Sequence, residues 1–532
     1  MNILANWILT NSASENLTLV CSLILLLMQK LGFNHQFQIN HVFEEEIDFQ
    51  EIQSEQFEQD NTEYKQHVQE KEELSKLLSS SLASAILSLF VSLLNKQSPI
   101  KYKSFLVVLI KASSHLMVND NFRRSYRKQG AIKNMIKLIK DILTSIQNQE
   151  KQLSPNESSE YIDLISYIID FFGKFVHDNK KNREYFILKG GVSLCSKFID
   201  KTFPIFYNND KLIKSCCSVL GNIAVSNDNK IMLWVLGSIP HLIKIVTDDI
   251  KDKQESQTRA YERAEYGFYA LWKASIDCED VQEELMKSKF IDIALQIVQK
   301  YSSNINLIAF SLAIIRRLAS NPKYKDEIAK NFLLTLMTFI KIFLETQQNQ
   351  TNQTLSYHHK LGVAFIYKEI LGCLGVLAVE DKHKQEITDN QGIELVIMSA
   401  MLNINKPKII KTALGCLINL ATTVENKQAL SKDASFYQLL YTVLEQYDQM
   451  TPMIDYSLRL ILNTADNKIS YQNYISGSIF KKSLLFMEKH KKNANIVWSS
   501  IQILRLLCNS GKISITKQFQ NRQGIEEIHE GI

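Results

Sequence analysis

The most informative stretch of this chain is Thr412-Ala-Leu-Gly-Cys-Leu-Ile-Asn-Leu-Ala421, which continues as Thr-Thr-Val-Glu-Asn-Lys427. A related stretch, Ser218-Val-Leu-Gly-Asn-Ile-Ala224, continues as Val-Ser-Asn-Asp-Asn-Lys230. In both copies an Asn lies two residues before an Ala, and an Asn-Lys pair begins five residues after it. A third copy, Leu371-Gly-Cys-Leu-Gly-Val-Leu-Ala378, lacks the Asn. Self-similarity of this kind indicates a repeat protein rather than a string of unrelated domains.

The repeat extends over most of the chain. Each unit can be anchored on the small or apolar residue equivalent to Ala421, and the short spacings between anchors cluster near about 43 residues, as in helical repeats. Polar insertions near residues 144–160 and 345–360 account for the longest spacings. The other anchors are Met117, Val176, Ala224, Ser275, Ala319, Ala378, Ala465 and Leu507.

Composition and periodicity predict helices. Only 17 Gly and 7 Pro occur in 532 residues, too few turn residues for a protein built from many hairpins. Leu414, Leu417, Ile418 and Ala421 fall on one helical face. Each unit therefore reads as a short helix, a Gly-containing bend, a second helix and a long third helix that carries the anchor. We expect positive φ at the bend glycines, since glycine adopts it without steric cost. These are Gly130, Gly190, Gly237, Gly392, Gly477 and Gly524.

This order of elements, with the third helix ending Leu-x-Asn-Leu-Ala, resembles the armadillo-repeat family over roughly residues 100–530. The resemblance implies an all-α fold, a right-handed α-solenoid of armadillo-like three-helix repeats. HEAT-like units remain an alternative at the two ends, where the match is poor. The expected organisation is N-terminal capping helices at 1–39, an acidic linker or insert at 40–73, and the repeat array at 74–532.

In the armadillo family the third helices line a concave groove, and an Asn two before the anchor holds an extended peptide. The equivalents here include Lys and Arg but no acidic residue, which predicts a basic groove for acidic, extended or helical partner segments. The alternative is that they are solvent-exposed polar residues on a fold whose function lies elsewhere. The Trp that the family places four residues earlier is absent, which argues against a nuclear-import adaptor. The positions are His115, Lys174, Asn222, Lys273, Arg317, Val376, Asn419, Asn463 and Arg505.

Two charged segments add further hypotheses. Residues 44–73 carry a net charge of about −10 and could occupy the groove as a tethered competitor, or serve as a solvated linker. A basic patch follows residue 120; it would suit a phosphate backbone or the acidic tails of tubulin, although a solvated helix face looks the same. The patch consists of Arg123, Arg124, Arg127, Lys128, Lys133, Lys137 and Lys140.

The sequence contains no recognised catalytic motif, and the eight Cys include no C-x-x-C pair, so neither an enzyme nor a metal or cofactor site is predicted. Residues 17–28 are apolar but too short to span a bilayer. The uncharged stretch 77–95 contains six Ser, and we expect it to be a packed helix rather than a membrane segment.

We therefore expect a non-enzymatic scaffold or adaptor that binds proteins within a large complex, with no small-molecule substrate and no membrane. Richness in Asn, Lys, Gln and Ile suggests an A/T-rich genome such as a ciliate's. Because armadillo proteins are familiar parts of ciliary axonemes, the resemblance favours a cytoplasmic protein of the axoneme or another microtubule-based assembly, with tubulin or axonemal partners. The alternatives are a soluble G-protein regulator of the exchange-factor or chaperone type, and a transport adaptor.

Overall fold

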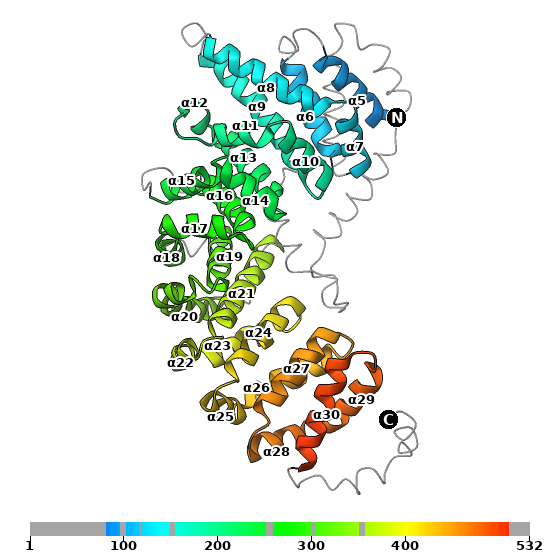
Figure 1. Ribbon diagram of the computed structural model, residues 1–532, viewed down its shortest axis with the longest axis vertical. Helices are drawn as coiled ribbons and strands as arrows, with labels where there is room; N and C mark the ends of the chain where they lie inside the picture. Colours follow the sequence, from blue (N-terminus) through cyan, green and yellow to red (C-terminus); the bar gives the residue numbers. More distant parts are fainter. Residues whose placement is uncertain are drawn as a thin grey trace. The chain divides into compact units, whose positions relative to one another are not determined.

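The computed structural model describes residues 81–95, 103–117, 119–148, 155–251, 259–300, 304–349 and 357–509 (Figure 1). Within these ranges the secondary structure is helical, from α5 to α30, and contains no strand. The expected capping helices at 1–39, the acidic segment at 40–73 and Gly524 lie outside the described residues. The described chain forms two compact units, the first ending at Arg317 and the second beginning at Leu318.

The first unit is built from successive helix trios. Its third helices are α6 (Lys103–Leu116), α9 (Pro155–Val176), α13 (Asp210–Ile223), α16 (Arg259–Ser275) and α19 (Ile305–Ser320), which runs past the unit boundary. Its first helices are α7 (Asp120–Lys128), α10 (Lys180–Leu188), α14 (Asn227–Val235) and α17 (Glu279–Lys287). The second helices are α5 (Ser81–Leu94), α8 (Ala131–Asn148), α11 (Gly191–Phe198) with the short α12 (Pro204–Tyr207), α15 (Ser238–Lys251) and α18 (Phe290–Lys300). Helix α9 packs on α6 and α13, and α13 packs on α16.

The second unit continues the pattern with one exception. Its third helices are α21 (Tyr357–Leu377), α24 (Pro407–Leu420), α27 (Thr451–Thr464) and α30 (Ala494–Asn509), each packed on the next. The first helices are α22 (Asp381–Asp389), α25 (Val424–Lys432) and α28 (Lys468–Ser476). The second helices are α23 (Gly392–Leu402), α26 (Ala434–Gln446) and α29 (Ile479–Lys489). Before them, α20 (Lys325–Asn349) takes the place of a first and a second helix, because no Gly or Pro interrupts it.

The repeated Asn-Lys pair has a local structural role. The Asn lies in the first turn of α14 and of α25, and it donates its side-chain amide to a carbonyl at the end of the preceding third helix. Asn229 donates to the Ile223 carbonyl at 2.9 Å, and Asn426 donates to the Leu420 carbonyl at 3.0 Å. The last carbonyls of a helix have no partner within it, so this bond caps the third helix and fixes the corner that follows.

The glycine prediction is only partly correct. Gly130, Gly190 and Gly237 have positive φ, at 75°, 82° and 74°. Gly477 has a φ of −76°, and its neighbour Ser478 takes the left-handed conformation instead. Gly477 is required by packing, because a Cβ there would lie 2.2 Å from the Tyr441 ring.

The core runs continuously along each unit between the helix layers. Helix α5 contributes Ile86, Phe90 and Leu93, all buried, and packs on α6 and α8 as expected for this uncharged stretch. In the described part of the chain, no single helix has the length and apolar character needed to cross a membrane, although the bent pair Asn227–Val235 and Ser238–Ile250 meets those two criteria together.

Candidate partner-binding surface

The predicted groove positions lie at the same place on successive third helices. In the first unit they are His115 on α6, Lys174 on α9, Asn222 on α13, Lys273 on α16 and Arg317 on α19. In the second unit they are Val376 on α21, Asn419 on α24, Asn463 on α27 and Arg505 on α30. The side chain of His115 lies outside the described residues. The third helices from α6 to α16 and from α21 to α30 pack in order, and Tyr269 and Trp272 of α16 contact Phe310 of α19. These positions therefore form a row within each unit.

The three asparagines of this row tie neighbouring third helices together. Asn222 donates to the Gly173 carbonyl at 3.1 Å and accepts from the Tyr269 hydroxyl at 2.7 Å, and it is buried. Asn419 donates to the Gly375 carbonyl at 2.8 Å, and Asn463 donates to the Ile418 carbonyl at 3.3 Å. The geometry therefore gives Asn222 a structural task, and its side chain is not presented to a partner's backbone.

The cations of the row have different surroundings. Lys174 lies 3.6 Å from Asp170 one turn earlier on α9, so its charge is locally balanced. Lys273 packs against the ring of Trp272, with its Nζ 4.5 Å from the ring centroid. Arg317 is half-buried and Arg505 is exposed.

A third cation joins Lys273 and Arg317. Lys230, from the Asn-Lys pair at the start of α14, donates to the Ile276 carbonyl just beyond α16. Burial lowers the pKa of Lys230, Asp277 opposes this, and the positive charges of Arg317 and Lys273 lower the pKa further. Lys230, Lys273 and Arg317 are here called the cationic cluster; Lys230 is buried, and Lys273 and Arg317 are the two half-buried members that reach the surface. The sequence offered a signal for Lys230 in the repeated Asn-Lys pair, but did not show that it meets the row.

A second cationic feature spans three third helices. Tyr167 on α9 lies between Lys211 on α13, whose Nζ is 3.1 Å from the ring centroid, and Lys111 on α6, at 4.4 Å. Burial would raise the pKa of Tyr167, but the two lysines outweigh it and the pKa is lowered. Acidic residues also occur along this face, since Glu262 on the next third helix, α16, pairs with Lys214 on α13. The face is thus mixed in charge along its length, and positive at the cationic cluster.

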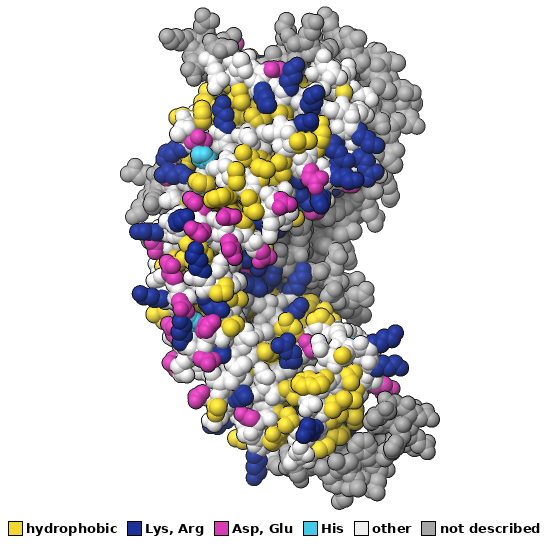
Figure 2. Space-filling model, in the orientation of Figure 1, with side chains coloured by type: hydrophobic (Ala, Val, Ile, Leu, Met, Phe, Trp, Pro, Cys, Tyr) yellow, Lys and Arg dark blue, Asp and Glu magenta, His cyan; other side chains and the backbone are white. Residues whose placement is uncertain are grey.

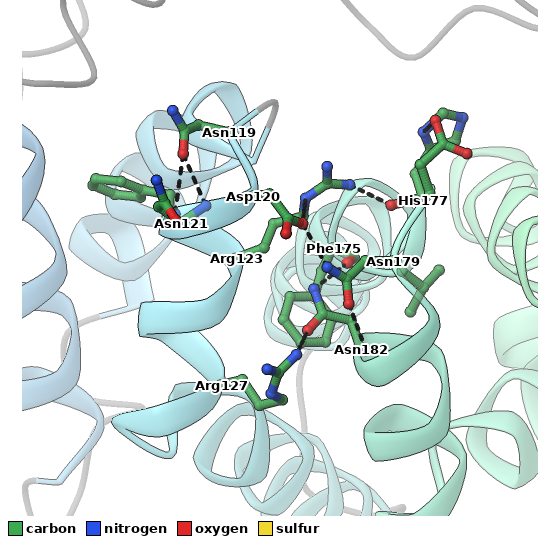
Figure 3. Close-up of polar contacts among 12 residues, drawn as sticks. Asn119, Asp120, Asn121, Arg123, Arg127, Phe175, His177, Asn179 and Asn182 are labelled. Atoms are coloured by element: carbon green, nitrogen blue, oxygen red, sulfur yellow. Dashed lines mark hydrogen bonds and ion pairs between the residues drawn. The ribbon is translucent and has the colours of Figure 1, made fainter.

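The structure separates the predicted basic patch into two groups. Arg123 and Arg127 of α7 turn toward the next repeat (Figure 3). Arg123 donates to the His177 carbonyl and lies 3.4 Å from Asp120, and Arg127 donates to the Asn182 side chain. Burial lowers the pKa of Arg123, with Asp120 and Asp178 opposing. These two arginines hold repeats together, whereas five side chains are exposed, namely Arg124, Lys128, Lys133, Lys137 and Lys140.

Among the residues that the structure describes, no group of three His, Cys, Asp or Glu side chains is placed to hold a metal ion. Seven Cys are described, all as free thiols. Burial raises the pKa of the Cys416 thiol to about 12, so this group is not a reactive thiolate near neutral pH.

The sequence matches no family model, and no curated protein matches it. Solved structures resemble the fold. An engineered protein of known crystal structure aligns with a TM-score of 0.56 and 14% identity, covering 87% of this chain and 98% of that chain. A structure described by the phosphorylation-controlled interaction of cadherin with β-catenin aligns with a TM-score of 0.44 and 13% identity, covering 82% of this chain and 99% of that one. A designed armadillo repeat protein in complex with the peptide (KR)4 aligns with a TM-score of 0.38 and 13% identity, covering 50% of this chain and 99% of that one.

At 14% identity the first of these likenesses concerns the fold alone. The helix trios and the order in which their third helices pack describe that fold in this chain. The chain has the fold of an all-α solenoid built from armadillo-like three-helix repeats.

Proposed function

We propose that this chain is a non-enzymatic scaffold or adaptor that binds protein segments along its third-helix face. The observation that carries the proposal is the cationic cluster. Lys230, Lys273 and Arg317 come from three helices, and Asp277 is the carboxylate that acts on Lys230. A concentration of positive charge on an otherwise mixed face favours an acidic, extended partner segment, and it raises the association rate at low salt.

The test compares cations of the same row in different surroundings. Lys273→Gln with Arg317→Gln should weaken binding of an acidic peptide by about fivefold or more at low salt, and should flatten the salt dependence. Lys174→Gln is the matched control, because the charge of Lys174 is already balanced by Asp170. Fluorescence polarisation with an acidic peptide and a scrambled neutral peptide measures both effects. Equal affinities for the wild type and the double variant would disprove the role of the cluster.

The cellular setting is a further part of the proposal. A ciliary axoneme or another microtubule-based assembly is favoured by the sequence composition and by analogy, with acidic tubulin tails as one source of the partner segment. The alternatives are a soluble G-protein regulator and a transport adaptor. A tagged copy retained in cilia after detergent extraction supports the axonemal setting. A diffuse, nucleotide-sensitive pool would favour the regulator.

A further inference from the structure

The outer side of α14 is apolar, unlike the outer sides of its neighbours. Five of the six residues from Ile231 to Leu236 are exposed, and Val235 is 65% exposed. Leu188, at the position in α10 that corresponds to Val235, is 77% exposed. Figure 2 shows hydrophobic side chains gathered over α10 and α14. Single exposed apolar side chains are common on protein surfaces, whereas a contiguous group of them marks an interaction site.

The two first helices on either side of α14 carry opposite charges at equivalent positions. Helix α10 begins Lys180-Lys181 and α17 begins Glu279-Asp280, and all four side chains are exposed. Helix α7, beyond α10, adds exposed Arg124 and Lys128 on the basic side.

The row of α7, α10, α14 and α17, here called the first-helix row, therefore carries cations at the beginning of α10, apolar side chains on the later half of α14 and acidic side chains at the beginning of α17. In Figure 2 basic side chains gather over α7 and α10, whereas acidic and basic side chains both occur toward α17. Such a surface is complementary in charge to a reversed copy of itself.

We propose that the first-helix row binds a second copy of this chain in a twofold-symmetric dimer, centred on α14. The helices of the row run in the same sense, because each is the first helix of a successive repeat. A twofold axis parallel to α14 places α14 against α14 of the other copy, and α10 against its α17. The N-terminal ends of α10 and α17 then face each other across the interface. Lys180 and Lys181 then meet Glu279 and Asp280 twice, as an isologous interface requires.

Other occupants fit this surface less well. The second in-plane twofold, perpendicular to α14, would place α10 antiparallel against α10 of the other copy and so leave Lys180 and Lys181 without the acidic residues of α17 opposite them. An anionic membrane would attract α7 and α10 but repel the acidic beginning of α17.

The first experiment tests the apolar centre in the full chain by sedimentation velocity over a range of concentrations. The wild type should dimerise at tens of micromolar or below, and Val235→Asp should raise the dimer dissociation constant by about tenfold or more, because the residue is buried twice in the dimer. Val379→Asp is the matched control, since Val379 is also exposed, at 53%, but lies in the second unit. Thermal unfolding should be unchanged in both variants.

The second experiment tests the charge arrangement with two reversed variants. Lys180→Glu with Lys181→Glu makes the beginnings of both α10 and α17 acidic, and Glu279→Lys with Asp280→Lys makes both beginnings basic. Each variant alone should lose about tenfold or more in self-association, because like charges then face each other across the interface. A mixture of the two should form a heterodimer, because every facing pair is again opposite in charge.

Three outcomes would overturn the proposal. These are a wild type that stays monomeric at tens of micromolar, charge-reversed variants that dimerise like the wild type, and a mixture that forms no heterodimer. A monomeric wild type whose binding to anionic vesicles depends on Val235 would assign the patch to a lipid surface instead.

Discussion

Asn222 illustrates how one side chain can link three repeats. Its amide reaches back to the Gly173 carbonyl on α9, and its oxygen accepts from Tyr269 on α16. Asn419 and Asn463 repeat the first of these bonds, each reaching one third helix back. The repeated Asn is thus explained by inter-repeat hydrogen bonding, whether or not a partner also contacts the half-buried copies.

Replacement of these asparagines should have graded effects on stability. Asn222→Ala leaves a buried carbonyl and a buried hydroxyl without this partner, which costs about 2–3 kcal/mol. Asn463→Ala removes one bond at a half-buried site and should cost about 1 kcal/mol. Urea unfolding followed by circular dichroism measures the difference. A larger loss for Asn463→Ala would contradict the assigned contacts.

Lys406, just before α24, should make stability depend on pH. Burial lowers its pKa from 10.5 to about 8, with Lys360 as a smaller cause. Below pH 8 both the folded and unfolded states hold the proton, so the folded state bears the full penalty of a charged amine. Between about 8 and 10.5 the unfolded state binds more protons, so the free energy of unfolding rises with pH.

Lys406→Met should therefore stabilise the protein at pH 7 by about 1–2 kcal/mol, allowing for solvent screening. It should also reduce the rise in stability above pH 8. Unfolding in urea at several pH values tests this, and an unchanged slope would contradict a lowered pKa. Any contribution of the Lys406–Asn403 hydrogen bond would make the gain at pH 7 smaller.

At the bends between first and second helices, a left-handed backbone conformation is adopted either by a glycine or by a residue with a side chain. Gly130, Gly190 and Gly237 take the left-handed conformation in the first unit. At other bends a residue with a side chain takes this conformation: Lys289 in the first unit, and Gln391 and Ser478 in the second, with φ of 57°, 62° and 58°. A residue with a Cβ is strained there, by about 1 kcal/mol or more.

Replacing a bend glycine by alanine, or a non-glycine bend residue by glycine, should change the free energy of unfolding in opposite directions. Gly130→Ala should cost about 1 kcal/mol through backbone strain alone, because nothing lies within 4 Å of the added Cβ. Gln391→Gly should be neutral or stabilising by up to about 1 kcal/mol, since relief of strain is partly offset by unfolded-state entropy. Thermal unfolding of both variants measures the effects. A stabilising Gly130→Ala would contradict the bend geometry.

Stability in a repeat protein depends chiefly on contacts between neighbouring repeats. Leu420 is fully buried at the end of α24, which packs on α21 and α27. Damage at this position should therefore spread first to those helices, within the second unit.

Leu420→Asp should lower stability by several kcal/mol, because it buries a carboxylate among apolar side chains, whereas Asn419→Ala should cost about 1 kcal/mol. Hydrogen exchange read by mass spectrometry should show faster exchange in α21, α24 and α27 of Leu420→Asp. Helices α9 and α13 should exchange as in the wild type. Uniformly faster exchange would show that the whole array unfolds as one cooperative body.

The fold of this protein was predictable because its signals are local and repeated. The face shared by Leu414, Leu417 and Ile418 is visible in the sequence and buried in the structure. The repeat around Ala224 and Ala421 correctly placed the ends of α13 and α24. The unbroken α20 was harder to predict, because its anchor spacing resembles that of a unit with an insertion.

The sequence did not predict which group each polar side chain would hydrogen-bond, because this depends on which atoms of neighbouring repeats come within hydrogen-bonding distance. The sequence established that Lys174, Asn222 and Lys273 occupy equivalent positions. The ion pair of Lys174 with Asp170, four residues earlier on the same helix, follows from helical spacing. Only packing in three dimensions buried Asn222 and brought Lys230 into the field of Lys273 and Arg317. Helical periodicity is a property of a few adjacent residues, whereas the hydrogen bonds of Asn222 and Lys230 join residues about a repeat apart and depend on side-chain geometry.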